Sequence, residues 1–147
     1  MISKVLGCYY MDDCIFCRII NGEIPSYTIY QDDKTLAFLD IDPDTRGHTL
    51  VIPKKHARNI IDMEDTDIEA VFRTVKKVVG SMKVSLDLDG LNLVVNQGEV
   101  AGQVIHHFHC HIIPRYIDDG IKYSSKGYSS STEELEELAG TISGNIE

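Results

Sequence analysis

Three histidines occupy alternate positions in the segment HFHCHII, residues 107–113. Successive side chains of a strand point to opposite faces, so we expect His107, His109 and His111 on one face and the apolar residues between them on the other. Imidazole titrates near neutral pH and therefore suits metal binding, proton transfer or group transfer. Three solvated histidines on an exposed strand are a weaker interpretation, because the alternation with apolar residues is strict.

Cys14 and Cys17 form a second pattern with chemical meaning, a Cys-x-x-Cys spacing. Residues 1–11 lack the features of a secretory signal, so we expect a cytosolic protein, in which a structural disulfide is disfavoured. In that setting the spacing indicates metal binding or redox chemistry. A pair of thiols that binds no metal is the alternative at this stage.

Five segments have the alternation or the β-branched and aromatic content that is typical of strands. They are residues 28–30, 35–40, 48–53, 91–96 and 105–114. Pro43, Asp44 and Gly47 supply turn chemistry between the second and third segments, which favours antiparallel pairing of those two. The fifth segment carries the three histidines.

One long helix is predicted between the third and fourth strands. Apolar residues repeat at helical spacing from about Thr66 to Leu86, and either Asp65 or Thr66 is suited to cap the first turn. A short helix that closes at Gly22 is also expected. Strands combined with one long helix predict an α+β fold with an antiparallel sheet of about five main strands.

A short C-terminal helix completes the predicted fold. Ser131 and Thr132 precede an acidic first turn, which is typical of a helix N-terminus. Leu135, Leu138 and Ile142 share one side of this helix, and we expect that side to be buried.

Length and charge limit the classes of function. The 147 residues suffice for one domain, expected at residues 11–147, and we expect residues 1–10 to form a disordered extension. The formal net charge of −9 disfavours nucleic acids and anionic membranes as partners. A small phosphorylated ligand remains compatible with this charge, because backbone donors and histidines can hold one phosphate locally.

In type and order, these motifs resemble the signature of the histidine triad (HIT) family. The resemblance covers about residues 14–116. It is carried by CIFC at 14–17, LAFLDI at 36–41, GHTLVIPK at 47–54, and by Gly102, Gln103, His107, His109, His111, Ile112, Ile113, Pro114 and Arg115. It implies a HIT-like fold and the nucleotide-binding, hydrolytic branch that has a zinc-type Cys-x-x-Cys near its N-terminus.

The resemblance assigns catalytic roles to three histidines. His109 would be the nucleophile that attacks the α-phosphorus of a nucleotide derivative and forms a nucleotidyl-imidazole, which water then hydrolyses. His111 would donate a hydrogen bond to the phosphoryl oxygens as their charge develops. His48 would support the other two from a nearby position.

The resemblance also implies a nucleotide-binding site. Asp40 would bind the ribose hydroxyls, and apolar residues would enclose the base, although core packing is an equal alternative for those residues. Val104 stands where some relatives carry a hydroxyl that faces the phosphate, so Gln103 and the backbone at Gly102 would contact more of the phosphate. With His109 and His111, the expected nucleotide-binding residues are Phe16, Phe38, Asp40, Ile41, Asn96, Gly102, Gln103 and Val104.

Zinc-bearing members of the family point to His56 and His107 as the residues that would complete a site with Cys14 and Cys17. Such a site has four protein ligands and no open position for a metal-bound water, so the zinc would be structural. His107 would then be structural as well. The alternative is a zinc-dependent hydrolase in which the histidines are catalytic ligands.

We therefore expect the protein to be a cytoplasmic, homodimeric hydrolase without a nucleic-acid or membrane partner. It would cleave the bond between the α-phosphate of a nucleoside monophosphate, most simply AMP or GMP, and a leaving group. An amine leaving group would make the protein a phosphoramidase, and a second nucleotide would make it a dinucleoside polyphosphate hydrolase. A non-enzymatic AMP- or GMP-binding sensor or scaffold is the alternative from another class.

Overall fold

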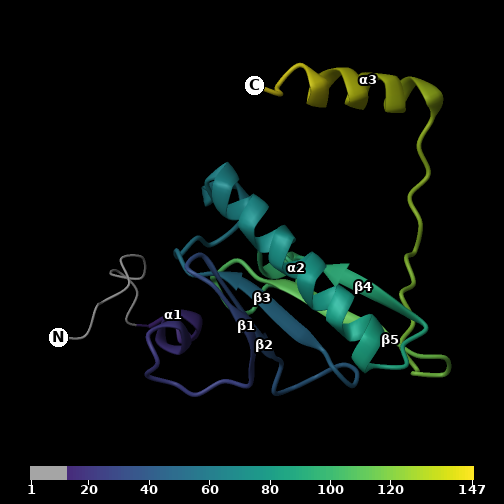
Figure 1. Cartoon of the computed structure of the whole chain (residues 1–147). Helices are drawn as coiled ribbons and strands as arrows, with labels where there is room; N and C mark the ends of the chain where they lie inside the picture. The colour runs from purple at the N-terminus through teal and green to yellow at the C-terminus, as the bar shows by residue number, and fades with distance from the viewer. Residues whose placement is uncertain (1–12) are drawn as a thin grey trace.

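The computed structural model of the protein describes residues 13–147, and the extension predicted for residues 1–10 lies outside them. Five strands form one sheet in the order β1-β2-β3-β5-β4, and each neighbouring pair is antiparallel (Figure 1). The strands are β1 (Thr28–Gln31), β2 (Thr35–Leu39), β3 (Thr49–Pro53), β4 (Gly90–Val94) and β5 (Cys110–Arg115). The α+β fold with a five-stranded antiparallel sheet is therefore confirmed.

The long helix α2 (Asp65–Ser85) covers one face of the sheet and contacts β1, β2, β3 and β5 (Figure 1). Its buried row, which includes Val71, Val75 and Val78, packs with Phe108 and Ile112 in the larger core cluster. The residue before the helix, Glu64, has no side-chain capping bond, so capping by Asp65 or Thr66 was wrong. Both of those residues lie inside the first turn instead.

The opposite face of the sheet carries the short helix α1 (Ile15–Ile20) and a second core cluster. Phe16 of α1 packs there with Phe38 of β2 and Leu50 of β3. Two 3-10 turns, η1 (Ile60–Asp62) and η2 (Glu99–Ala101), follow β3 and β4. Among residues 13–147, no helix combines the length and the apolar character that crossing a bilayer requires.

The histidine strand is shorter than the sequence predicts. β5 begins at Cys110, so His107 and His109 lie ahead of it and only His111 belongs to the sheet. Bonds outside the β3–β5 ladder explain the late start, because the Phe108 amide donates to the Ala57 carbonyl and the His109 ring donates to the His107 carbonyl. The alternation itself is confirmed for the apolar residues, since Phe108, Cys110 and Ile112 are all buried on the α2 side.

The C-terminal helix α3 (Thr132–Ser143) forms where it is predicted, with Ser131 accepting a hydrogen bond from the Glu134 amide. Its apolar side is not buried, which corrects the expectation for Leu135, Leu138 and Ile142. Figure 1 shows α3 standing away from the sheet at the end of an extended connection. Amphipathic spacing predicted the helix correctly, but it does not specify which surface covers the apolar side.

Gly47 sets the backbone direction immediately before His48. It has a φ of +90°, and a Cβ at this position would lie 2.7 Å from Leu86 Cδ1 and 3.3 Å from Pro114 Cγ. Gly47→Ala is expected to lower the free energy of unfolding by about 1–3 kcal/mol, because it adds backbone strain and a steric clash. Denaturant titration measures this, with Gly80→Ala as the control because a Cβ at Gly80 meets no atom within 4 Å. Equal stability of Gly47→Ala and the wild type would contradict the argument.

Candidate functional site

A cavity of about 440 Å³ opens on the face of the sheet that carries α1. Its walls come from α1, the end of β2, and the segments that surround β5. Nine of the ten residues expected to bind a nucleotide line it, namely Phe16, Phe38, Asp40, Ile41, Asn96, Gly102, Val104, His109 and His111. The volume is within the range of about 300–1,000 Å³ that small-molecule sites occupy.

His109 is a buried side chain in the wall of this cavity. Its Nδ1 lies 2.7 Å from the His107 carbonyl oxygen, which can only accept, so Nδ1 carries the proton and Nε2 carries the lone pair. Burial lowers the pKa of His109 below the usual value for histidine. The neutral ring with a nucleophilic Nε2 is therefore the favoured form.

His48 and His111 form a hydrogen-bonded pair beside His109. The Asp44 amide donates to His48 Nδ1 at 3.0 Å, so the neutral His48 ring carries its proton on Nε2. That Nε2 lies 2.9 Å from His111 Nδ1 and donates to it, which leaves the His111 proton on its own Nε2. Burial, followed by the nearby His109 and His48, lowers the pKa of His111 to about 4. His111 is thus a neutral donor in the cavity wall.

Asp40 contributes the carboxylate of the site. Its Oδ2 lies 3.6 Å from His48 Nε2, and its Oδ1 accepts the Asp42 amide at 2.9 Å. Asn96 and Gly102 lie together on the other wall, because a Cβ at Gly102 would be 3.7 Å from Asn96 Nδ2. Gly102 has a φ of +91°, a conformation that favours glycine. These positions offer polar groups at the rim of a largely apolar cavity.

Two predicted residues do not line the cavity. Gln103 is buried, its amide nitrogen donates to the Arg58 and Ile105 carbonyls, and its amide oxygen accepts the Gly98 amide. Its side chain therefore organises the loop after β4. His48 acts on the cavity indirectly, through its bond to His111 and its contact with the Asp40 carboxylate.

Sequence reasoning missed part of the lining, most of it apolar. The additional lining residues are Ile15, Ile19, Ile24, Pro25, Ser26, Leu39, Asp42, Leu50 and Ile105. Leu50 could have been predicted as a lining residue. It pairs with Phe38 across β2 and β3, and directly opposed residues share a face of the sheet. No periodic signal marks the irregular segment 24–26.

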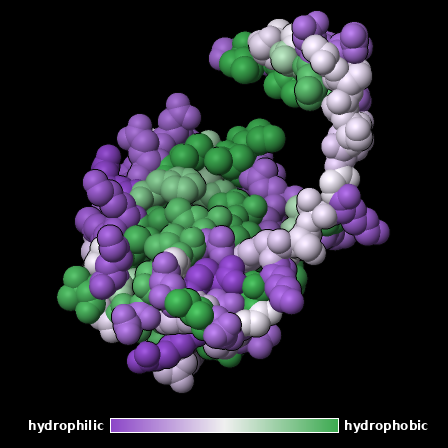
Figure 2. Space-filling model, turned by 90° about the vertical axis from the view of Figure 1, so that its right-hand side faces the viewer, coloured by the Kyte–Doolittle hydropathy of each residue, from purple (hydrophilic) through white to green (hydrophobic). Residues whose placement is uncertain are grey.

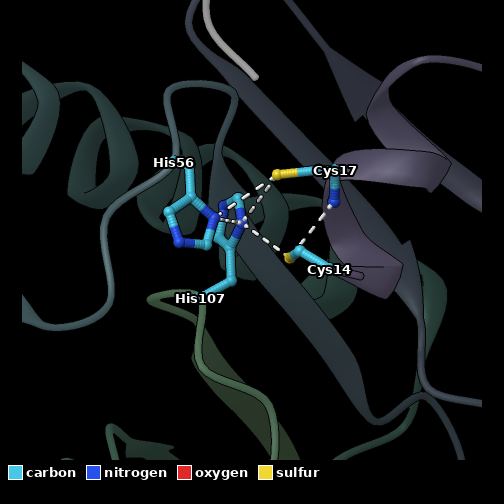
Figure 3. Close-up of side chains that lie close together, drawn as sticks. All are labelled: Cys14, Cys17, His56 and His107. Carbon is cyan, nitrogen blue, oxygen red and sulfur yellow. Dashed lines mark hydrogen bonds between the residues drawn. The ribbon is translucent and has the colours of Figure 1, made fainter. Parts of the chain in front are cut away.

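A second group of side chains lies next to the cavity. Cys14, Cys17, His56 and His107 bring one potential metal-ligand atom each to within 4.8 Å of the others (Figure 3). His107 Nδ1 lies 3.2 Å from His56 Nδ1, 3.5 Å from Cys14 Sγ and 3.7 Å from Cys17 Sγ, and His56 Nδ1 lies 3.4 Å from Cys17 Sγ. The sulfurs come from the start of α1 and the imidazoles from the segments after β3 and before β5.

The donor set and its spacing fit a tetrahedral zinc ion. Zn–N and Zn–S bonds of about 2.1 and 2.3 Å give tetrahedral edges of about 3.4 Å between nitrogens and about 3.6 Å between nitrogen and sulfur. Four of the six separations among the ligand atoms are 3.2–3.7 Å and match these edges, and all six are within 4.8 Å. His107 Nε2 donates to the Pro53 carbonyl at 2.8 Å, which fixes Nδ1 as the nitrogen with the lone pair. Burial lowers the pKa of His107 to about 4, so the ring is neutral as a ligand must be.

The cysteine and histidine cluster is in direct contact with His109. His107 contributes its ring to the cluster and its carbonyl to His109 Nδ1. Phe16, between the two cysteines in sequence, packs edge-on against His109 with ring centroids 5.3 Å apart. Whatever fixes the cluster therefore also fixes the tautomer and the orientation of His109.

The chemistry available to this arrangement is nucleophilic displacement. It combines a neutral imidazole with a defined lone pair, a neighbouring imidazole donor, a carboxylate at the rim and apolar walls. Such a site can attack an electrophilic centre, stabilise the charge that develops on it, and hold a ligand that has one apolar and one hydroxylated end.

Comparison with known proteins gives a family match, two relatives of matching length and one longer relative. The HIT domain family matches residues 21–118. An uncharacterized HIT-like protein of Methanocaldococcus jannaschii is 48% identical over 129 residues, covering 86% of this chain and 99% of its own. The adenosine 5'-monophosphoramidase of Schizosaccharomyces pombe is 37% identical over 134 residues, covering 90% and 98%. An adenylylsulfatase of Arabidopsis thaliana is 40% identical over 113 residues, covering 77% and 57%.

Solved structures share the fold. A HIT family protein from Bacillus subtilis superposes with a TM-score of 0.88 at 40% identity, covering 92% of this chain and 99% of its own. A Zn-bound histidine triad family protein from Mycobacterium smegmatis superposes with a TM-score of 0.71 at 31% identity, covering 91% and 98%. The fold, the spacing of the histidines and these comparisons agree: the chain belongs to the histidine triad (HIT) family.

Proposed function

We propose that the protein is a nucleotide hydrolase that works through a covalent nucleotidyl-histidine. The observation that carries this proposal is the state of His109, whose protonated Nδ1 donates to the His107 carbonyl and whose Nε2 keeps its lone pair. A solvent-exposed histidine whose ring nitrogens bond only to water would have no such fixed tautomer. The hydrolase names of two relatives, in Schizosaccharomyces pombe and Arabidopsis thaliana, support the same reaction class.

The reaction has two displacement steps at the α-phosphorus. In the first, His109 Nε2 forms a bond to phosphorus, and the leaving group departs with the electron pair of its own bond and takes a proton from solvent water. In the second, water attacks the phosphorus and releases one proton to solvent, and the N–P bond breaks with its electron pair returning to His109 Nε2. The products are a nucleoside monophosphate and neutral His109. His111 donates from Nε2 to a phosphoryl oxygen in both steps, with its tautomer fixed by His48.

The nucleotide is proposed to lie with its base against α1 and the end of β2. Phe16, Phe38 and Ile41 form an apolar wall there, and Asp40 is placed to accept from the ribose hydroxyls. Asn96 and the backbone at Gly102 then face the phosphate from the opposite wall. Val104 is apolar and the Gln103 side chain bonds backbone groups, so the phosphate contacts on this side are left to Asn96 and to backbone amides.

We propose an amine as the leaving group, so that the substrate is a purine nucleoside phosphoramidate. The phosphoramidase relative covers nearly the whole chain, which favours this class. A dinucleoside polyphosphate is the second candidate, because the cavity wall that includes Val104 adjoins another cavity of about 440 Å³ with Arg58 and His106 in its lining.

Zinc is proposed as a structural ion held by Cys14, Cys17, His56 and His107. The fit of the ligand atoms and the Zn-bound relative support it. When bound, the ion would supply a cross-link between α1 and the segments around His107, with no coordination position left for a water. Cys14 and Cys17 are both buried, which disfavours exchange with outside thiols. A single domain over residues 11–147, a cytoplasmic location and a homodimer complete the proposal.

Mass spectrometry of the intact protein tests this function. Brief mixing with adenosine phosphoramidate or, separately, with diadenosine polyphosphate is expected to add one adenylate to the wild-type chain, and the substrate with the faster release of AMP identifies the leaving-group class. Neither an adduct nor AMP from either substrate would instead favour the nucleotide-binding sensor or scaffold.

A further inference from the structure

The helix α3 presents an apolar row that its own chain does not cover. Leu135, Leu138 and Ile142 are 57%, 45% and 64% exposed, and no residue of the helix is buried. Positions three and seven residues apart lie on one side of a helix, so the three side chains form a continuous stripe. Figure 1 shows the helix held away from the sheet by the connection that follows β5.

The start of the connection between β5 and α3 is anchored to the body. Arg115 at the end of β5 makes two bonds to the Asp119 carboxylate, and it also donates to Asn92 and to the Ile121 carbonyl. The Ile117 amide donates to Asp89, which ties the same segment to the turn before β4. The point from which the arm leaves the body is therefore fixed by several bonds.

The body carries an apolar surface on the side from which the arm leaves. Figure 2 shows this surface, with the apolar side of α3 facing it across a gap. Strand β4 is the edge of the sheet, and Leu93 on it is exposed. Because Leu93 lies opposite the core residue Ile112, it points to the α2 side of the sheet, where Phe72 of α2 is also exposed.

The charges of α3 and α2 are complementary. Helix α3 contains Glu133, Glu134, Glu136 and Glu137 and no basic residue. Over residues 70–85, α2 contains Arg73, Lys76, Lys77 and Lys83 and no acidic residue. Exposed apolar residues, Phe72 and Val84, accompany the basic residues of α2. The two segments also have similar lengths, at 12 and 16 residues.

We propose that α3 packs along α2 of a second copy of this chain, so that each protomer clasps the other with its C-terminal arm. The surface that covers the stripe of α3 must be apolar to pack against it and basic to pair with its glutamates. It must also fit the gap between α3 and the apolar face of the body, and we infer that a second copy of the chain supplies it. The α2 segment described above has these properties, and a two-fold axis gives both arms the same contact. The inference rests on the proposed homodimer, and it adds the surface that α3 occupies.

A photo-crosslinking amino acid at position 138 tests where α3 lies. Irradiation of the full-length Leu138→p-benzoylphenylalanine protein is expected to give a product of twice the chain mass, with the crosslinked peptide in α2. A crosslink within one chain, or a crosslink to a segment other than α2, would overturn the proposal. Gly140→p-benzoylphenylalanine is the matched control, because position 140 lies on the side of the helix opposite Leu138 and a Cβ there meets no atom within 4 Å, so little product is expected.

Sedimentation of substituted proteins gives the second measurement. Leu135→Gln, Leu138→Gln and Ile142→Gln combined are expected to raise the dimer dissociation constant about 100-fold, because central apolar contacts dominate association. Tyr27→Gln with Ile117→Gln is the control, since both residues are exposed and lie outside α3. An unchanged dimer in the triple variant would contradict the docking of α3, whereas the adenylate adduct would still report the hydrolase separately.

Discussion

His109→Ala is expected to lower kcat/KM by at least about 10⁴-fold while the protein keeps its fold and its affinity for AMP. Loss of a covalent nucleophile removes the bond on which both displacement steps depend, and nucleophile knockouts in other enzymes have effects of this size or greater. The smaller side chain should leave AMP binding within several-fold, because the apolar walls and Asp40 are untouched. Neither an adenylate adduct nor a burst of product should form.

Steady-state hydrolysis, AMP titration and thermal unfolding of the variant measure these three outcomes together. His106→Ala, assayed with the phosphoramidate substrate, is the matched control, because the His106 side chain is 43% exposed and lines only the second cavity, which this smaller substrate is not proposed to fill. Its kcat/KM should stay within a few-fold of the wild-type value. Turnover that survives in His109→Ala would rule out the covalent route, and a wild type that binds AMP without turnover would support the sensor.

The order of the elements could be predicted from the sequence because it depends on local periodicity. The alternation around Phe108, Cys110 and Ile112 indicated which side of the strand enters the core, and the helical repeat in α2 indicated its buried row. The start of β5 could not be predicted in this way, because it depends on side-chain and backbone bonds from distant segments. Phe108, for example, donates to Ala57, a residue with no local signal.

The candidate site was predictable where a residue type is tied to one chemical role. Cys14 and His107 are 93 positions apart and lie 3.5 Å from each other. The resemblance to a family predicted that they belong to one site, whereas periodicity could not. Gln103 shows the limit of such reasoning, because an amide can serve a ligand or the backbone equally well, and here it bonds three backbone groups. The exposed stripe of α3 shows a second limit, since amphipathic spacing does not identify the surface that covers it.

Cys14→Ser is expected to remove bound zinc and to lower the melting temperature of the protein by about 8–16 °C. Structural zinc sites can contribute more than 10 kcal/mol in small domains that lack a core, but this chain has two apolar clusters of its own, so we expect a loss of about 4 kcal/mol. For a chain of this size, each kcal/mol corresponds to about 2–4 °C. Loss of the cross-link should free the start of α1, including Phe16, which packs against His109.

The metal content of purified protein and its thermal unfolding, with and without a chelator, distinguish this expectation from its alternatives. Cys110→Ala is the matched control, because Cys110 is a buried cysteine in the other core cluster, where burial raises the pKa of its thiol to about 11 and disfavours metal binding. It should keep one zinc per chain and respond to the chelator as the wild type does.

Cys14→Ser should not respond to the chelator. Its kcat should fall about 10–100-fold, because His107 no longer fixes His109 as firmly. A catalytic zinc would instead abolish turnover on metal removal at unchanged melting temperature, and full zinc occupancy in Cys14→Ser would show that this cysteine is not a ligand.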